Sequence, residues 1–139
     1  MVGTGEQMKQ QAAVIPFRGS GKKLEICLIR KKGSKKKWGI PKGFIDRGDS
    51  SKETALKEAG EEAGLTGRLV GDPVGRYEYE KWGVSLEVTV YLMEVKDEED
   101  EWDEADFRER HWTTLQSATE LLERHPVHPL LKSAKDRLS

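Results

Sequence analysis

Three glutamates lie close together in one short segment of the 139-residue sequence: Glu58, Glu61 and Glu62. In a helix, offsets of three and four residues bring side chains to one face within a single turn. A solvated charged face explains part of this pattern, because Glu53, Lys57 and Glu61 have the four-residue spacing of helix-stabilising ion pairs. It does not explain Glu58 and Glu62, a like-charge pair at the same spacing. A hard divalent cation bound through oxygen ligands would neutralise that pair.

The segment around these glutamates has the start and stop signals of one helix, over residues 51–63. Ser50 followed by Glu53 is a capping-box pattern, and Gly64 supplies a C-terminal stop. A stripe of apolar residues at helical spacing is expected to be buried beside the acidic face: Ala55, Leu56, Ala59 and Ala63. Such a stripe would hold the carboxylates fixed at the edge of a core.

Strands are predicted before and after this helix. Residues 12–17 and 24–30 are apolar runs that flank a glycine-rich turn, which is typical of a hairpin. Residues 31–37 form a basic loop, and residues 38–43 contain one proline and two glycines, so a shaped loop is expected there. Residues 68–79 and 84–95 are predicted to be two further strands that pair across residues 81–83.

The C-terminal part is predicted to contain an acidic loop, a short strand and two helices. These elements are expected at residues 97–106, 108–112, 115–122 and 130–138. The order of strands and helices, without an internal repeat, predicts one α/β domain over residues 9–139. Residues 1–8 are expected to be a small, polar leader outside the domain.

The composition limits the kinds of partner. With 24 Lys and Arg against 25 Asp and Glu, the net charge is −1, and the chain has no charge excess that would favour a nucleic-acid duplex. No apolar run approaches the roughly 20 residues of a membrane span. Cys27 is the single cysteine, which excludes an internal disulfide and a cysteine-based zinc site. We expect a reducing compartment, the cytoplasm, and no membrane partner.

Residues 43–49 (GFIDRGD) and 57–65 (KEAGEEAGL) together resemble the Nudix box. That box is Gly, five residues, Glu, seven residues, then Arg-Glu-U-x-Glu-Glu-x-Gly-U, in which U is aliphatic. The spacing matches in full from Gly43 to Leu65, with Asp49 in place of the usual Glu and Lys57 in place of the usual Arg. The resemblance implies the Nudix fold, an α/β/α sandwich around a mixed β-sheet.

The resemblance also implies roles for the residues of the box. Glu58 and Glu62 are the expected main ligands of Mg²⁺, for which Mn²⁺ is a possible substitute, and Glu61 is a further ligand or a base. The carbonyl of Gly43 is an additional expected ligand. Lys57 is placed among the catalytic residues, where it would position Glu58 or Glu62 less firmly than Arg. The implied reaction is attack of water on a phosphorus of a diphosphate bridge.

Two further resemblances narrow the small-molecule substrate. Residues 38–43 (WGIPKG) look like the loop before the box in diadenosine polyphosphate hydrolases. Residues 108–112 (RERHW) and 126–128 (PVH) resemble the tail of diphosphoinositol polyphosphate phosphohydrolases. Both substrates are rich in phosphate and need extra cations. The candidates for these cations are Lys42, Arg18, Arg30, Arg108, Arg110 and the lysines of residues 31–37.

Other roles stay open at this level. A nucleoside triphosphate pool-cleaning pyrophosphatase and a non-catalytic ligand-sensing module are alternative functions, and the protein is expected to be a monomer or a homodimer. The candidates for a general base outside the box are Glu87, Glu101, Asp103 and Glu104, and the acidic loop is either a solvated excursion or a lid. The aromatic residues Tyr77, Tyr79 and Trp82 are expected to pack rather than stack on a base. His111, His125 and His128 are assigned no chemistry.

Overall fold

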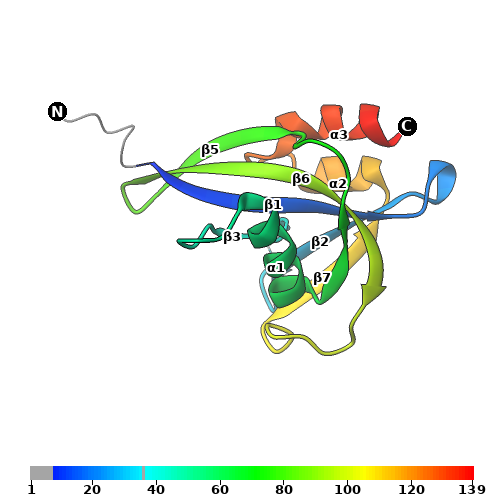
Figure 1. Ribbon diagram of the computed structural model, residues 1–139. Helices are drawn as coiled ribbons and strands as arrows, with labels where there is room; N and C mark the ends of the chain where they lie inside the picture. The colour runs from blue at the N-terminus through cyan, green and yellow to red at the C-terminus, as the bar shows by residue number, and fades with distance from the viewer. Residues whose placement is uncertain (1–7, 36) are drawn as a thin grey trace.

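The protein is described by a computed structural model that covers residues 8–35 and 37–139. Within these residues the strands form one mixed seven-stranded sheet, with the order β4-β6-β1-β2-β7, β3 added to β1 and β5 added to β6 (Figure 1). The strands are β1 Lys9–Arg18, β2 Glu25–Lys31, β3 Lys42–Phe44, β4 Leu65–Leu69, β5 Gly75–Lys81, β6 Val84–Glu98 and β7 Arg108–Thr113. Most of the predicted leader lies outside the described residues.

Strand β1 lies at the centre of the sheet. It runs parallel to β6 from Lys9 to Phe17, and it pairs with β2 only at Phe17 and Arg18. The predicted hairpin is therefore confirmed at its turn, but most of β1 pairs with a strand about 75 residues further along the chain. A strand buried on both faces needs a continuous apolar run, and residues 11–17 are all buried.

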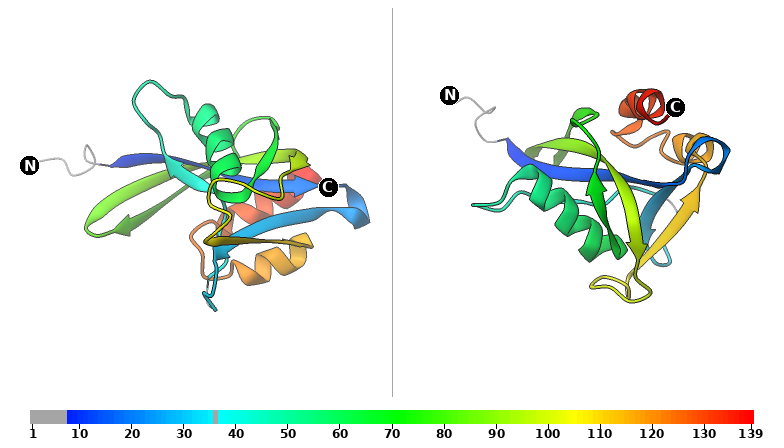
Figure 2. Two further views of the ribbon diagram at one scale, coloured as in Figure 1. Left: turned by 90° about the horizontal axis from the view of Figure 1, so that it is seen from below. Right: turned by 45° about the vertical axis from the view of Figure 1, so that its right-hand side comes forward.

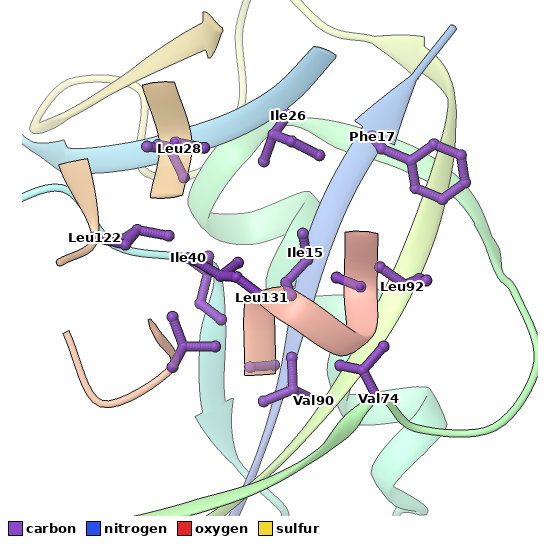
Figure 3. Packing of buried hydrophobic residues seen from close by; sticks show 14 of the residues in the cluster. Ile15, Phe17, Ile26, Leu28, Ile40, Val74, Val90, Leu92, Leu122 and Leu131 are labelled. Atoms are coloured by element: carbon purple, nitrogen blue, oxygen red, sulfur yellow. The ribbon is translucent and has the colours of Figure 1, made fainter. Parts of the chain in front are cut away.

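Helices cover both faces of the sheet. Helix α1 Ser51–Ala63 lies on one face, and α2 Leu115–Leu121 and α3 Leu131–Leu138 lie on the other (Figures 1 and 2). Short 3-10 turns occur at Gly21–Lys23 and His128–Leu130. The larger core cluster lies under α2 and α3, and Figure 3 shows Leu122 and Leu131 packed toward Ile15, Ile40 and Val90. This arrangement confirms the predicted α/β/α sandwich around a mixed sheet.

Two predicted elements differ from the observed ones. The single strand expected at residues 68–79 is two strands, because β4 ends at Leu69 and β5 begins at Gly75, and Pro73 between them cannot donate a ladder hydrogen bond. Both strands pair antiparallel with β6. The loop expected at residues 38–43 ends in a short strand, since Lys42 and Gly43 belong to β3.

The hairpin between β5 and β6 confirms the predicted pairing across residues 81–83. Lys81 pairs with Val84, and the two turn residues both have positive φ, 52° at Trp82 and 76° at Gly83. This is the geometry of a two-residue hairpin turn. Trp82 is 91% exposed, so it does not pack into the core as expected, and its ring centre lies 4.8 Å from the Lys81 ammonium group. No helix in the described part of the chain has the length and apolarity to cross a membrane.

Candidate active site

Helix α1 begins and ends where its sequence predicts. The Ser50 hydroxyl accepts a hydrogen bond from the Glu53 amide, and the Glu53 carboxylate accepts one from the Ser50 amide. At the other end Gly64 has a φ of 66°, which closes the helix in the left-handed region. The alanines Ala55, Ala59 and Ala63 are fully buried, but Leu56 is 37% exposed, so the predicted apolar stripe is narrower than expected.

Glu62 is the most buried carboxylate of the helix, with 9% of the residue exposed. Its Oε1 accepts a hydrogen bond of 3.0 Å from the backbone amide of Lys42, and its Oε2 lies 3.6 Å from Nη2 of Arg108. Burial raises the pKa of Glu62, while the Lys42 amide and the Arg108 guanidinium act in the opposite direction. These two partners fix the carboxylate in one orientation.

Glu58 lies directly against strand β3. A Cβ atom added to Gly43 would overlap the Glu58 carboxyl group, with both carboxylate oxygens 2.6 Å from it. A side chain at position 43 would therefore displace the end of the Glu58 side chain, and glycine leaves the carboxyl group in place. Burial, followed by the negative charges of Glu62 and Glu61, raises the pKa of Glu58 to about 7.

The acidic loop contributes a fourth carboxylate, Glu104. Its Oε1 accepts a hydrogen bond of 2.9 Å from Nε of Arg108, the arginine that also pairs with Glu62. The charge of Glu104 contributes to the raised pKa values of both Glu58 and Glu62. Of the four candidates for an outside base, Glu104 is the one whose charge acts on both Glu58 and Glu62, while Asp103 lines a shallow pocket together with Glu61. Glu101 and Asp103 are exposed, and Glu87 lies within β6 opposite Glu78.

The donor chemistry of this cluster fits a hard divalent cation. Glu58, Glu61, Glu62 and Glu104 offer only carboxylate oxygens, and the other three raise the pKa of Glu58, so their negative charges converge. In residues 8–35 and 37–139, however, no three acidic, histidine or cysteine side chains are already arranged to hold a metal ion. The glutamates are gathered on one face, as expected, without forming a closed set of ligands.

A cavity of about 310 Å³ opens beside these carboxylates. Five cationic side chains line it, and no acidic residue of the described chain does. The cationic residues are Arg30, Lys31, Lys37, Lys42 and Arg108. Nζ of Lys42 donates a hydrogen bond of 3.0 Å to the Tyr79 hydroxyl, which in turn donates to Gln11. Tyr79 packs against the core, as expected, and its hydroxyl also positions a cation.

The wall of the cavity also contains Trp38 and His125. The guanidinium of Arg30 stacks 4.1 Å above the Trp38 ring. His125 accepts a hydrogen bond at Nδ1 from the Val127 amide, and burial lowers its pKa to about 4, so it is neutral at pH 7. Sequence reasoning does not place His125 here, because no local signal shows that residues 38 and 125 meet in space.

Three predicted site residues have other partners. Arg18 lies beyond the part of β1 that contacts β3, and it pairs with Glu25 and Glu98. Arg110 is directed at the end of α1, where its Nη1 donates to the Ala63 carbonyl. Neither arginine lines the cationic cavity, and their predicted role in substrate binding stays a prediction.

Lys57 is the third predicted site residue with other partners. Its Nζ lies 3.3 Å from Asp46 and 3.9 Å from Asp49, in the loop before the helix. The carboxylates of the loop, rather than Glu58 or Glu62, are the partners of this side chain. The charge of Lys57 also acts to lower the pKa of Glu58, so its predicted role beside the glutamates stays a prediction.

Comparison with known proteins identifies the family. The family model described as "NUDIX domain" matches residues 8–133, which is nearly the whole chain. The chain belongs to the Nudix hydrolase family. This Nudix hydrolase acts on acid anhydrides in phosphorus-containing substrates, and proteins of its family are generally dependent on divalent metals.

Curated relatives of this Nudix hydrolase include plant and animal proteins. It is 31% identical over 143 residues to the Arabidopsis thaliana protein "Nudix hydrolase 16, mitochondrial", covering 88% of this chain and 75% of that one. It is 29% identical over 126 residues to human "Diphosphoinositol polyphosphate phosphohydrolase 3-alpha", with the same two coverages of 88% and 75%. Other plant relatives are longer, and the chain spans 46% of Nudix hydrolase 13 and 58% of Nudix hydrolase 4.

Among solved structures, an Ap4A hydrolase binary complex from C. elegans has a TM-score of 0.80 to this Nudix hydrolase. The two chains are 22% identical, and the match covers 94% of this chain and 98% of the other. At this identity the similarity supports the fold alone.

Proposed function

We propose that this Nudix hydrolase is a Mg²⁺-dependent pyrophosphohydrolase of phosphate-rich small molecules, with Mn²⁺ as a substitute cation. Its best candidate substrates are dinucleoside polyphosphates of the diadenosine tetraphosphate type and diphosphoinositol polyphosphates. One observation carries the proposal: Lys42 and Arg108 both contact Glu62 and both line the cationic cavity. The carboxylates and the cavity therefore form one continuous site.

Within this site the box residues have the tasks of binding and proton transfer. Glu58 and Glu62 would hold the cation, with Glu61 and the Gly43 carbonyl as further ligands. When bound, the cation supplies positive charge that makes water a better nucleophile and offsets charge on the leaving phosphate. Glu61 and Glu104 are the carboxylates left to accept the proton of the attacking water, and Arg108 holds Glu104 in place.

The cavity supports a substrate with several phosphates. Lys42, Arg30 and Arg108 offer charged N–H donors, which bind phosphate oxygens more strongly than neutral donors do. A site with this many cations and no acidic lining residue in the described chain favours a polyanion over a substrate with a single diphosphate. The name of the human relative, a diphosphoinositol polyphosphate phosphohydrolase, agrees with this class of substrate.

A substrate panel tests the proposal. Purified protein with Mg²⁺ is incubated with diadenosine tetraphosphate, a diphosphoinositol polyphosphate, nucleoside triphosphates, dinucleotides and nucleotide sugars, and phosphorylated products are quantified. The highest kcat/KM is expected for one of the first two. Preference for a nucleoside triphosphate would instead support the pool-cleaning alternative. Binding without any product would support the ligand-sensing alternative.

The proposal extends to the setting of the protein. The substrate is a small molecule and not a nucleic-acid duplex, in keeping with a net charge of −1. We propose a monomer or homodimer in the cytoplasm, where a free, buried Cys27 would persist. Relatives named as chloroplastic and mitochondrial make the compartment a matter for direct measurement.

A further inference from the structure

The acidic loop and the start of β7 bind the C-terminal end of α1. The last carbonyl groups of a helix have no partners within the helix and must find them elsewhere. Here four consecutive carbonyls, from residue 61 to residue 64, each accept a hydrogen bond from the segment 99–110. The four bonds are Glu104 N to Glu61 O (3.0 Å), Trp102 Nε1 to Glu62 O (3.0 Å), Arg110 Nη1 to Ala63 O (2.7 Å) and Glu99 N to Gly64 O (2.9 Å).

Two side chains in this segment also contact each other. The Arg110 guanidinium stacks 4.2 Å above the Trp102 ring, and its Nη2 donates a second hydrogen bond of 2.6 Å to the Glu99 carbonyl. Its Nε lies 2.9 Å from Glu98, and the side chain is only 12% exposed. A Cβ atom at Gly64 would lie 2.9 Å from both the Trp102 ring and Nη1 of Arg110. The contact is thus tight enough to require glycine.

The charge of the helix end explains why a cation is useful there. The C-terminus of a helix carries partial negative charge, which a basic residue in the last turn usually offsets. The last turn of α1 has no basic residue and instead carries Glu61 and Glu62. Arg110 brings the missing positive charge from β7. The same loop that contributes Glu104 therefore also stabilises the helix that carries the box glutamates.

We propose that Trp102 and Arg110 are positioning residues, which hold the last turn of α1 so that Glu58 and Glu62 keep the orientation needed to bind the divalent cation. This inference rests on the proposed function for the cation. The hydrogen bonds to α1 are observed independently of that function. The positioning role also differs from both roles left open for the acidic loop, a solvated excursion and a lid, because the segment is fastened to α1 by four hydrogen bonds. When a residue that orients a metal-binding side chain without touching the metal is replaced, the metal affinity typically changes by about tenfold or more.

The chain offers a matched control for Trp102. Trp112 also donates its indole N–H over 3.0 Å, to Glu98, and it also lies under an arginine, with Arg18 3.8 Å from the ring centre. Unlike Trp102, it gives no hydrogen bond to α1. Phenylalanine at either position keeps a ring for the arginine but removes the indole donor and part of the ring area. Trp112→Phe frees a Glu98 oxygen that also pairs with Nε of Arg110 and keeps all four bonds to α1, whereas Trp102→Phe removes the bond to the Glu62 carbonyl.

Two measurements on the whole protein test the inference. Mn²⁺ binding is followed by electron paramagnetic resonance, and hydrogen exchange of the α1 amides is measured on cation-free protein. For Trp102→Phe we expect a Kd for Mn²⁺ about tenfold higher and faster exchange in the last turn of α1, where the Gly64 amide bonds to the Gly60 carbonyl. For Trp112→Phe both quantities are expected to stay within about twofold of wild type. Equal melting temperatures of the two variants would show that general stability is not the cause.

The outcomes separate this inference from the proposed function. If wild type binds Mn²⁺ and Trp102→Phe binds it equally well, or if both variants weaken binding alike, the positioning role is refuted. If wild type binds no Mn²⁺, the proposed function fails, and exchange still decides whether Trp102 holds the helix end. Arg110→Lys, which keeps the charge but loses the two-carbonyl contact, gives a second test through the same two readouts should Trp102→Phe fold poorly.

Discussion

Lys57 and Asp49, the two positions at which the Nudix box of this chain departs from the usual pattern, are ion-paired with Nζ and Oδ2 3.9 Å apart. Lys57 also donates a hydrogen bond of 3.3 Å to Asp46, and this partner raises the pKa of Lys57. The two departures thus belong to one contact between the loop and the helix. Because both side chains are about 40% exposed, water screens the pair, and its contribution to stability is small.

Restoring the family pattern tests the importance of this contact. In Asp49→Glu and Lys57→Arg, and in the double variant, we expect equal or higher kcat and a change in unfolding free energy below about 1 kcal/mol. The longer carboxylate and the planar guanidinium can form the same pair with better geometry. Steady-state kinetics and urea unfolding measure the two quantities. A collapse of activity on restoration would mean that these positions are tuned to each other in another way.

Glu62→Gln tests the buried carboxylate. Glutamine has the same shape and keeps an oxygen to accept the Lys42 amide, so the fold is expected to persist. The loss of charge should lower kcat by about two orders of magnitude or more. The exposed Glu80 of β5 provides the control, since Glu80→Gln removes the same charge away from the site. Turnover close to wild type in Glu62→Gln would contradict its role as a ligand.

Arg30 and Arg18 form a natural pair for testing the cavity. Each stacks on a tryptophan and pairs with a glutamate, but only Arg30 lines the cationic cavity. Arg30→Gln is expected to raise KM for the best substrate of the panel by about tenfold, the loss of one charged hydrogen bond. Arg18→Gln should leave KM unchanged. Equal effects of the two substitutions would show that the cavity does not bind substrate.

The raised pKa of Glu58 predicts competition between protons and the cation. With a pKa of about 7, Glu58 is protonated below neutrality in the cation-free protein. Mn²⁺ affinity should therefore fall by nearly tenfold per pH unit as the pH drops from 7 to 5. Titrations at three pH values measure this slope. Glu58→Gln should bind Mn²⁺ weakly with a flatter slope, whereas an unchanged slope would assign the proton to another group.

The same pKa has a consequence for stability. The folded-state pKa of Glu58 lies above its ordinary value of 4.5, so the folded protein binds this proton more tightly than the unfolded chain does. Cation-free protein should lose stability from this group as the pH rises from about 4.5 to about 7. Saturating Mg²⁺ should restore it. Melting temperatures of wild type and Glu58→Gln, compared at pH 5 and pH 8, measure the contribution.

The lowered pKa of His125 predicts that stability falls at acidic pH, opposite to the pH dependence expected from Glu58. Its folded-state pKa of about 4 lies below the ordinary 6.5, so the unfolded chain binds the proton more tightly and stability is lost as the pH falls from 6.5 to 4. The loss from this group should be on the order of 3 kcal/mol, since one pKa unit corresponds to about 1.4 kcal/mol. His125→Asn keeps an acceptor for the Val127 amide but cannot become charged. Urea unfolding should show a smaller acid loss in this variant than in wild type.

The sequence predicted the local features well. The capping box at Ser50, the stop at Gly64 and the turn at residues 81–83 all depend on signals within a few residues, and each is observed. The partners of β1 were not predicted, because parallel pairing with β6 depends on contacts far apart in the chain. The break in the strand at Pro73 was overlooked, although proline is itself a local signal against a continuous strand.

The cationic residues of the site show the same difference between what local signals predict and what depends on contacts far apart in the chain. Charge and motif position placed Lys42, Arg30 and Arg108 correctly near the box or the cavity. The same reasoning included Arg18 and Arg110, since a sequence does not show which glutamate or carbonyl a guanidinium will reach. The roles of Trp102 and His125 were also out of reach, because they depend on how the acidic loop folds against α1 and how the segment after α2 reaches the cationic cavity.

Lys42 contributes to the site through two separable chemical groups. Its peptide N–H holds Glu62, and every amino acid except proline would supply that group, while its ammonium group reaches the cavity. The side chain at this position can therefore change without loss of the hydrogen bond to the carboxylate. Natural or engineered substitutions of residue 42 would therefore change the selectivity for substrates independently of bond cleavage.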